Sequence, residues 1–223
     1  YGVEVEFSVP KVPYRETIKK VAEGQGKYKK QTGGHGQYGD VWLRLEPASE
    51  YGFEWRITGG VIPSKYQEAI EEGIKEAAKK GVLAGFPVMG FKAIVYNGSY
   101  HEVDSSDLAF QIAASLAFKK VMAEAHPVLL EPIYRLKVLV PQERVGDVLS
   151  DLQARRGRIL GMEQEGALSV VHAEVPLAEV LEYYDAPPAL TGGAGAYTLE
   201  FSHYAEVPPH LAQRIVQERA QEG

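Results

Sequence analysis

The chain has 223 residues, of which 45% are hydrophobic, and its formal net charge is −6 at pH 7. This length allows one large domain or two ordinary ones, and the negative charge argues against a general nucleic-acid-binding protein. The sequence contains no cysteine, which excludes disulfides and thiol chemistry. No apolar run approaches the roughly 18–20 residues that a membrane span needs, so we expect a cytoplasmic protein with no membrane partner.

The first part of the chain alternates between apolar and polar residues. Residues 1–10, which begin with Tyr rather than Met, have the period of a strand, and we expect them to be the last strand of an upstream domain in a longer protein. Residues 14–30 predict a strand, and residues 40–46 predict its partner in a hairpin. The segment 31–39 between them predicts a glycine-rich loop with its tip in solvent.

A strand and a helix are predicted next. Residues 51–58 alternate and predict a strand, and Pro63 marks the first turn of a helix that Gly81 ends. A buried strand is predicted at 87–96, followed by a turn at 97–98. The inner stripe of the predicted helix consists of Ala69, Ile70, Ile74 and Ala77.

A second, longer helix is predicted from about Ser106 to Ala125. Asp104 or Ser105 is expected to cap it, since either side chain can accept a hydrogen bond from a free backbone N–H group. Its buried stripe is predicted at Leu108, Ile112, Leu116 and Met122.

The pattern restarts after a boundary that we place near Leu130 to Pro132. The elements that follow have the order β-α-β-β-α-β, which is the ferredoxin-like arrangement, with a last helix after them. The predicted ranges are a strand at 133–141, a helix at 143–157, strands at 158–166 and 168–176, a short helix at 177–184, a strand at 196–204 and the last helix at about 208–220.

Three glycines, Gly34, Gly36 and Gly39, have the G-x-G-x-x-G spacing of some phosphate-binding loops. A dinucleotide site requires a helix after the glycines, because the helix N-terminus faces the pyrophosphate. Residues 40–46 instead alternate like a strand, so a glycine-rich turn is the favoured interpretation. A dinucleotide-dependent enzyme that uses this loop is the alternative.

Sites for catalysis or metal binding are not indicated. None of the six histidines pairs with another His or a Cys at metal-ligand spacing. A Ser-His-Asp set could be drawn from residues 101–106, but a triad is a spatial arrangement and adjacency does not establish one. An RNA-recognition motif in the second half is disfavoured, because its third strand, 168–175, lacks the stacking aromatic residues of that module.

Basic residues cluster in two places. Between Lys11 and Lys30 there are seven basic and two acidic residues, and this stretch leads into the glycine loop. It forms either a basic stem that approaches phosphates or a solvated strand face. The segment 154–158 leaves three arginines near a helix end, where they either complement the helix dipole or contact RNA phosphate.

Several long blocks resemble one known family in collinear order. The match covers nearly the whole chain from about Tyr14 and resembles the C-terminal third of elongation factor G, the ribosomal translocase, which is a GTPase. The blocks include KKQTGGHGQYGDV, GGVIPSKYQEAIEEGIKEAAKKGVLAGFPV, NGSYHEVDSSDLAFQIAAS, VLLEPI, GDVLSDLQARRGRILGME, VPLAEVLEY and EFSHYAEVP.

The resemblance implies an α/β (α+β) fold with two domains. Residues 11–130 resemble the elongated fourth domain of that factor, which is similar to the second domain of ribosomal protein S5. Residues 131–207 resemble its ferredoxin-like fifth domain, and residues 208–223 form a C-terminal helix. The GTP-binding domain, with GTP and Mg²⁺, is implied upstream of Tyr1, and no cofactor, metal or catalytic residue is expected in this segment.

The resemblance also implies a monomer that binds the ribosome. The tip of the fourth domain enters the small-subunit decoding region and contacts the A-site tRNA and mRNA, and the fifth domain lies near the large-subunit stalk base and the factor-binding rRNA. The implied tip residues are Gln31, Thr32, Gly33, Gly34, His35, Gly36, Gln37 and Tyr38 in one loop and His101, Glu102, Asp104, Ser105 and Ser106 in the other. Candidate phosphate contacts are Lys27, Lys29, Lys30, Arg155, Arg156 and Arg158.

The chain departs from the family pattern at three positions, where His35, Pro188 and Ala194 replace arginines. Fewer fixed positive charges should weaken contacts with phosphate, which suggests a divergent paralogue. One alternative function is therefore ribosome recycling or another ribosome-linked step. Another is a protein-interaction module in which contact with RNA is incidental.

Overall fold

The computed structural model describes residues 12–181 and 196–222, and the chain divides into two compact units. We call them the hairpin unit (Arg15–Leu130 with Val207–Gly223) and the ferredoxin-like unit (Tyr1–Tyr14 with Glu131–Glu206). Each is described separately below. The predicted strand at residues 1–10 lies outside the described residues.

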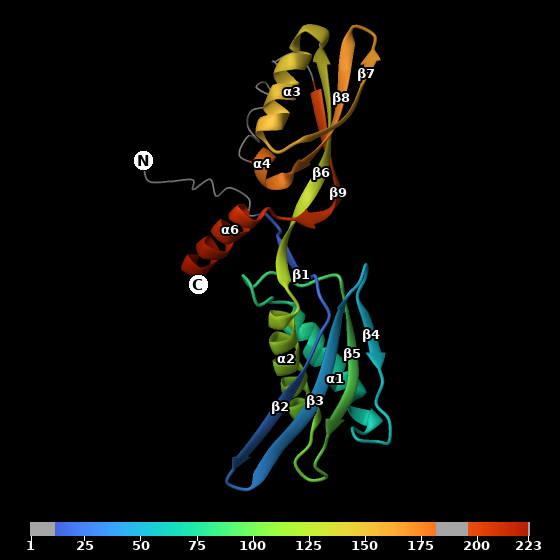
Figure 1. The fold of residues 1–223 in the computed structure, drawn as a ribbon, viewed down its shortest axis with the longest axis vertical. Helices are drawn as coiled ribbons and strands as arrows, with labels where there is room; N and C mark the ends of the chain where they lie inside the picture. The colour runs from blue at the N-terminus through green and yellow to red at the C-terminus, as the bar shows by residue number, and fades with distance from the viewer. Residues whose placement is uncertain (1–11, 182–195, 223) are drawn as a thin grey trace, which may run out of the picture. The chain divides into compact units, whose positions relative to one another are not determined.

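The hairpin unit is built on a four-stranded sheet with the order β2-β3-β5-β4, in which β4 is parallel to β5 and the other neighbours are antiparallel (Figure 1). Helix α2 packs on β2 and β3 and against α1. The elements are β2 (Ala22–Thr32), β3 (His35–Pro47), β4 (Gly52–Trp55), the 3₁₀ turn η1 (Ser64–Tyr66), α1 (Gln67–Ala78), β5 (Phe91–Ser99) and α2 (Asp107–Glu124).

Three further segments complete this unit at the end away from the β2–β3 turn. Strand β1 (Arg15–Ile18) pairs with the first four residues of β6 (Pro127–Pro141). Glu16 on β1 is fully buried, and its carboxylate accepts hydrogen bonds from the backbone N–H groups of Leu83, Ala84 and Phe86. Helix α6 (Pro209–Glu222) is hydrogen-bonded to the same segment, residues 83–86.

The core of the hairpin unit confirms one predicted helix stripe and corrects the other. Ala69, Ile70, Ile74 and Ala77 of α1 are buried as predicted, and so is Met122 of α2, but Leu108 and Leu116 are 55% and 43% exposed. Besides Met122, the buried face of α2 contains Ala109, Phe110, Ala113, Ala114, Ala117, Phe118 and Val121. Small residues on this face let the helix approach the sheet closely. The stabilisation from this close packing outweighs what burial of the larger leucine side chains would contribute.

Several predicted boundaries are wrong. The break near residues 19–21 separates β1 from β2, so 14–30 is not one strand, and the predicted turn at Asn97–Gly98 lies inside β5. The pairing register shifts between Trp42 and Leu43 of β3, which pair with Asn97 and Val95, so Tyr96 of β5 is the extra residue of a bulge. Helix α1 ends at Ala78, before Gly81.

The ferredoxin-like unit has the predicted β-α-β-β-α-β order. Its strands are arranged β9-β6-β8-β7, and Leu136, Val138, Leu152, Val171 and Ala173 are in its core. The elements after β6 are η2 (Gln142–Arg144), α3 (Val145–Ala154), β7 (Arg158–Glu165), β8 (Leu168–Pro176), α4 (Leu177–Leu181) and β9 (Ala196–Glu206). No helix among the described residues is long and apolar enough to cross a membrane.

Candidate functional site

Two segments far apart in the sequence meet at one end of the hairpin unit. The turn between β2 and β3 and the loop from His101 to Ser106 reach the same end (Figure 1). The backbone N–H of Tyr38 donates to the carbonyl of Asp104 at 2.9 Å, and Ser105 Oγ donates to the Tyr38 carbonyl at 2.8 Å. We call this end, formed by residues 31–38 and 101–106, the tip.

The glycine loop is much shorter than predicted. Thr32 pairs with His35 and Gln31 with Gly36, so residues 31–39 mostly belong to the strands and the turn consists of Gly33 and Gly34 alone. Both glycines have positive φ, +47° and +152°, and no atom lies within 4 Å of the position that a Cβ would take. The turn therefore requires glycine for its conformation and leaves its backbone open to a partner.

The other two glycines of the motif allow close packing around the tip. A Cβ added at Gly36 would lie 2.7 Å from Asp104 Oδ2, and one added at Gly39 would lie 2.5 Å from the Ala109 carbonyl. A Cβ at Gly26, on the neighbouring strand, would overlap the backbone of α2 at Ala113. These glycines let loop 101–106 and α2 pack closely on the hairpin. Because β3 and not a helix follows Gly39, the structure does not support the dinucleotide alternative.

His101 is held by its own loop. Its Nδ1 accepts from the backbone N–H groups of Val103 at 3.3 Å and Asp104 at 3.2 Å. These acceptor roles assign the proton of the neutral ring to Nε2. The side chain is 55% exposed, so Nε2–H is the group that the ring offers to a partner.

The remaining polar residues of this loop have structural roles. Ser105 Oγ accepts from the backbone N–H of His101 and donates to Tyr38, not to the imidazole, so no Ser-His-Asp relay forms. Ser106, and not Asp104 or Ser105 as predicted, caps α2 by accepting from Ala109 N at 3.1 Å. Glu102 is exposed and Asp104 is half-buried.

A buried hydrogen-bond chain supports Tyr38 and was missed in the sequence. The carboxylate of Asp40, which is 6% exposed, accepts from Gln25 Nε2 and from Ser99 Oγ, both at 2.6 Å. Ser99 Oγ lies 2.7 Å from the Tyr38 hydroxyl, and the Tyr38 ring centroid is 6.4 Å from that of His101. The sequence feature that could have indicated this chain is that Asp40 is the one acidic residue between Glu23 and Glu46.

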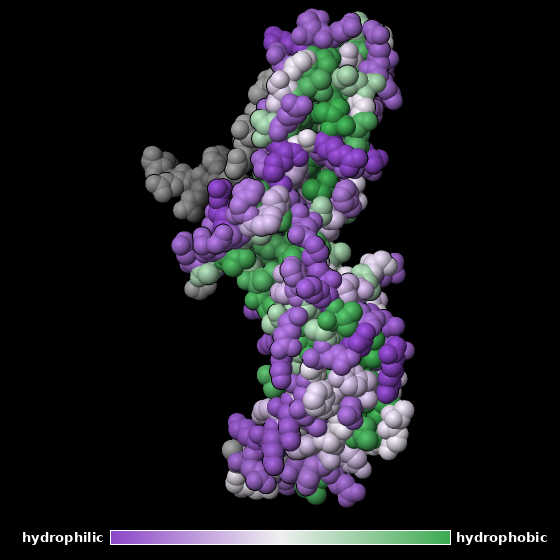
Figure 2. All heavy atoms as spheres, in the orientation of Figure 1, coloured by the Kyte–Doolittle hydropathy of each residue, from purple (hydrophilic) through white to green (hydrophobic). Residues whose placement is uncertain are grey.

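The predicted basic stem is exposed along β2. Lys27, Lys29 and Lys30 are all exposed, and Lys27 Nζ lies 5.4 Å from the centroid of the Tyr38 ring. Figure 2 shows hydrophilic residues gathered over this end of β2 and β3. His35 is exposed beside the turn, whereas Gln37 is half-buried, and its Oε1 has no hydrogen-bond partner among the described residues.

Two of the three arginines predicted to contact phosphate are engaged inside the ferredoxin-like unit. Arg155 is 5% exposed and its Nε donates to Asp151 at 2.8 Å. Arg156 donates from both terminal nitrogens to Glu131, at 2.8 and 2.9 Å, and from Nε to Glu179 at 2.9 Å. The geometry thus favours internal pairing for Arg155 and Arg156, while Arg158 is exposed at the start of β7.

Arg156 combines these ion pairs with a left-handed backbone conformation. Hydrogen bonds to Glu131 raise the pKa of the Arg156 guanidinium against the lowering effect of burial, and the bond to Glu179 raises that pKa further. Arg156 has φ +57° at the C-terminus of α3, a conformation that favours glycine. Pro188 and Ala194, the other departures from the family pattern, lie outside the described residues.

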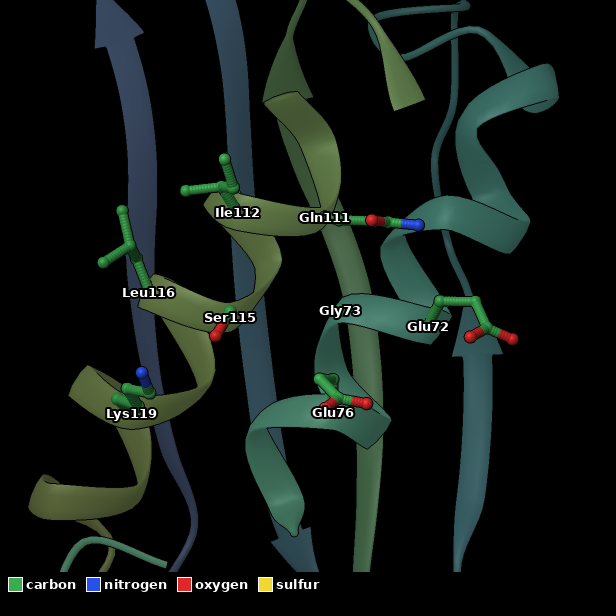
Figure 3. Close-up of a pocket in the computed structure, with 8 residues that line it drawn as sticks. All are labelled: Glu72, Gly73, Glu76, Gln111, Ile112, Ser115, Leu116 and Lys119. Carbon is green, nitrogen blue, oxygen red and sulfur yellow. The ribbon is translucent and has the colours of Figure 1, made fainter. Parts of the chain in front are cut away.

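A shallow groove of about 440 Å³ lies elsewhere on the hairpin unit, between α1 and α2 (Figure 3). Gly73 lets the two helices cross closely there. Figure 3 shows that Ile112 and Leu116 point away from α1, and that Glu72 points away from α2. No group of three or more metal-ligating side chains occurs in this groove or elsewhere in residues 12–181 and 196–222.

Comparison with known families agrees with this architecture. Residues 10–126 match the family described as elongation factor G, domain IV, and residues 128–215 match the one described as elongation factor G C-terminus. The two units are thus domains of a translation factor. The chain belongs to the elongation factor G family, which confirms the resemblance and the predicted fold class.

Individual relatives give the same result. The chain is 51% identical over 222 residues to elongation factor G of Aquifex pyrophilus, covering 98% of the chain and 32% of the relative. It is 51% identical over 226 residues to an elongation factor G-like protein of Thermotoga maritima, covering 100% of the chain and 33% of the relative. The chain thus spans about a third of the length of these relatives, whose names do not favour the recycling or dinucleotide alternatives.

A solved structure is similar to both units. A crystal structure from Thermus thermophilus shares 98% sequence identity with the chain at a TM-score of 0.92, covering all of this chain and 34% of that one.

Proposed function

We propose that this chain is the ribosome-binding arm of an elongation factor G, and that its tip contacts the tRNA–mRNA duplex in the decoding region during translocation. The observation that carries the proposal is the meeting of the open Gly33–Gly34 turn and His101 at one exposed end, in a chain of this family. No bond is made or broken at the tip.

The tip is suited to close approach to paired RNA without reading its sequence. RNA helices present 2′-hydroxyl groups in a wide, shallow minor groove. An open glycine turn lets the backbone come near such a surface, and His101 Nε2–H offers one donor that can meet a 2′-hydroxyl or a phosphate of any nucleotide. The exposed Lys27, Lys29 and Lys30 supply sequence-independent attraction to phosphate.

The rest of the proposed assembly follows the family. GTP and Mg²⁺ would bind a domain that is not part of this chain, and the GTPase activity would belong to that domain. The ferredoxin-like unit would lie near the large-subunit stalk base and the factor-binding rRNA. The factor would act as a monomer in the cytoplasm.

The test replaces His101 in the intact factor in two ways. His101→Ala removes the whole ring. His101→Asn places an amide oxygen where Nδ1 accepts the loop N–H groups, since Asn readily forms such local bonds, but it removes the outward donor. We expect both variants to slow single-round translocation by about tenfold, because one hydrogen bond contributes about 1–1.5 kcal/mol. Ribosome-stimulated GTP hydrolysis should be unchanged.

The matched control is His210→Ala, because His210 is also exposed but lies on α6. Translocation at the normal rate in both His101 variants would refute the proposed role of the tip. Association with ribosomes that resists both salt and nuclease would instead favour a protein-interaction module.

A further inference from the structure

A third loop reaches the same end of the hairpin unit. It connects β4 to η1 and includes residues 56–63 (Figure 1). Gly59 and Gly60 both have φ +67°, and no atom lies within 4 Å of the place that a Cβ would take at either one. As at the Gly33–Gly34 turn, the chain uses two adjacent glycines with positive φ and leaves their backbone open.

This third loop is held by two contacts, one from η1 to the tip and one from the loop itself to β5. The Tyr66 hydroxyl donates to the Ser105 carbonyl at 3.3 Å, which joins η1 to loop 101–106. Ile62 is 1% exposed and packs against Gly98, where an added Cβ would collide with the Ile62 side chain. The loop therefore has a defined position relative to Ser105.

The two sides of loop 101–106 carry the same pair of residue types. Lys65 Nζ lies 5.2 Å from the centroid of the Tyr66 ring, and Lys27 Nζ lies 5.4 Å from that of Tyr38. Each tyrosine is also hydrogen-bonded to loop 101–106, Tyr66 through its hydroxyl and Tyr38 through its backbone. Loop 101–106 is thus bonded to two lysine–tyrosine pairs, one on β2 and β3 and one on η1.

The charges of the three segments differ. Residues 56–66 contain no acidic residue and two basic ones, Lys65 and Arg56, of which Arg56 pairs with Glu54 at 2.7 Å. Loop 101–106 contains Glu102 and Asp104, which repel phosphate. Phosphate groups are therefore more favoured beside loop 101–106 than over it.

We propose that Lys65 and the Gly59–Gly60 turn form a second contact for an RNA sugar–phosphate backbone. A paired RNA offers two backbones across its minor groove. Lys27, Lys29 and Lys30 then face one strand and Lys65 faces the other, with loop 101–106 between them. A lysine ammonium suits this role, because it is a point charge that binds phosphate without a fixed geometry. The inference rests on the proposed function, because it assumes that the tip meets RNA.

The first test compares Lys65→Ala and Lys65→Arg in the intact factor by single-round translocation. We expect Lys65→Ala to slow translocation about threefold to tenfold, as the loss of one charged contact would, and Lys65→Arg to stay within about twofold of the unmodified factor. Lys75→Ala is the matched control, because Lys75 Nζ lies 5.5 Å from the centroid of the Tyr51 ring, away from the tip. A Lys65→Ala rate equal to that of Lys75→Ala overturns the proposal.

The second test locates the partner. Val61→Cys and Val82→Cys place a benzophenone cross-linker at positions with similar exposure, 37% and 39%, in an intact factor whose other cysteines are replaced. On the ribosome, RNA cross-links from position 61 and none from position 82 support the proposal. Cross-links from position 61 to protein alone, equal RNA cross-links from both positions, or no cross-link from position 61 overturn it.

Failure of this inference can be told apart from failure of the proposed function. If the His101→Asn variant slows translocation while the Lys65 variants and the cross-links give the negative results, the tip contacts RNA without the third loop. If the His101 variants also translocate normally, the proposed function itself fails.

Discussion

Glycine at Gly39 shows how a single residue can fix the position of the tip. The amide and carbonyl of Gly39 belong to the β2–β3 ladder, while its Cα faces the backbone of α2 at Ala109. Since α2 begins directly after loop 101–106, the contact between Gly39 and Ala109 fixes where that loop lies along the hairpin. The spacing that resembles a nucleotide motif thus reflects a turn at Gly34, close contact with Asp104 at Gly36 and helix packing at Gly39.

The packing role of Gly39 makes a quantitative prediction. Gly39→Ala should destabilise the hairpin unit by about 1–3 kcal/mol, because the methyl group would lie 2.5 Å from the Ala109 carbonyl and backbone must move. Urea unfolding followed by tryptophan fluorescence reports this unit, since both tryptophans, Trp42 and Trp55, lie in it.

Gly52→Ala is the control for that measurement. A Cβ at Gly52 would meet only the flexible Lys92 side chain, at 3.4 Å, so a change within about 0.5 kcal/mol is expected. Equal free energies of unfolding for the two variants would contradict the packing role of Gly39.

At the scale of elements, Arg156 joins three parts of the ferredoxin-like unit. Its guanidinium at the end of α3 contacts Glu131 on β6, which is 3% exposed, and Glu179 on α4. Removing the arginine would leave the Glu131 carboxylate buried without its partner. The free-energy cost of leaving this carboxylate unpaired exceeds the free energy that the intact pair contributes, because an unpaired buried charge is poorly solvated.

Arg156→Ala is therefore expected to destabilise the ferredoxin-like unit by about 3–5 kcal/mol. The measurement is urea unfolding by far-UV circular dichroism, with tryptophan fluorescence following the hairpin unit separately. Arg158→Ala, at an exposed position two residues later, should change the free energy of unfolding by less than about 0.5 kcal/mol. If Arg156→Ala were as mild as this control, the Glu131 pair would not be a structural link.

The elements show which parts of the fold could be predicted from the sequence. Strong periodicity identified α1 and its buried stripe, and element order identified the ferredoxin-like unit. The stripe of α2 was missed because large residues were weighted above the alanines that close packing requires. The loop at 31–39 and the turn at 97–98 were predicted from glycine content, but Gly39 and Gly98 lie in strands, next to the backbone of Ala109 and Asp40.

The candidate site could be predicted only in part for a related reason. The two tip segments were identified by resemblance and by glycine content. Asp40, Ser99, Tyr66 and Lys65 were missed, because their partners are distant in the sequence and only the folded chain brings them together. For Arg155 and Arg156 the sequence left helix-dipole pairing and phosphate contact open, because charge alone does not reveal a buried partner such as Glu131.

At the scale of the whole molecule, the chain has a net charge of −6 yet presents exposed lysines on β2 beside the tip. The long hairpin brings these charges and the open glycine turn to the end of a unit whose opposite end holds the buried Glu16 carboxylate. The function of the β2–β3 hairpin therefore depends on its length, because contact with a duplex in a confined site depends on how far the turn extends.

Shortening the hairpin tests that claim most directly. Deleting Gln31, Thr32, His35 and Gly36 removes two residue pairs, keeps the face of every remaining side chain, and places Gly33–Gly34 directly between Lys30 and Gln37. The strands become shorter by about 7 Å, at roughly 3.3–3.4 Å per residue. In the intact factor we predict normal ribosome-stimulated GTP hydrolysis with single-round translocation at least about tenfold slower. Translocation at the normal rate by a folded, shortened factor would contradict the account.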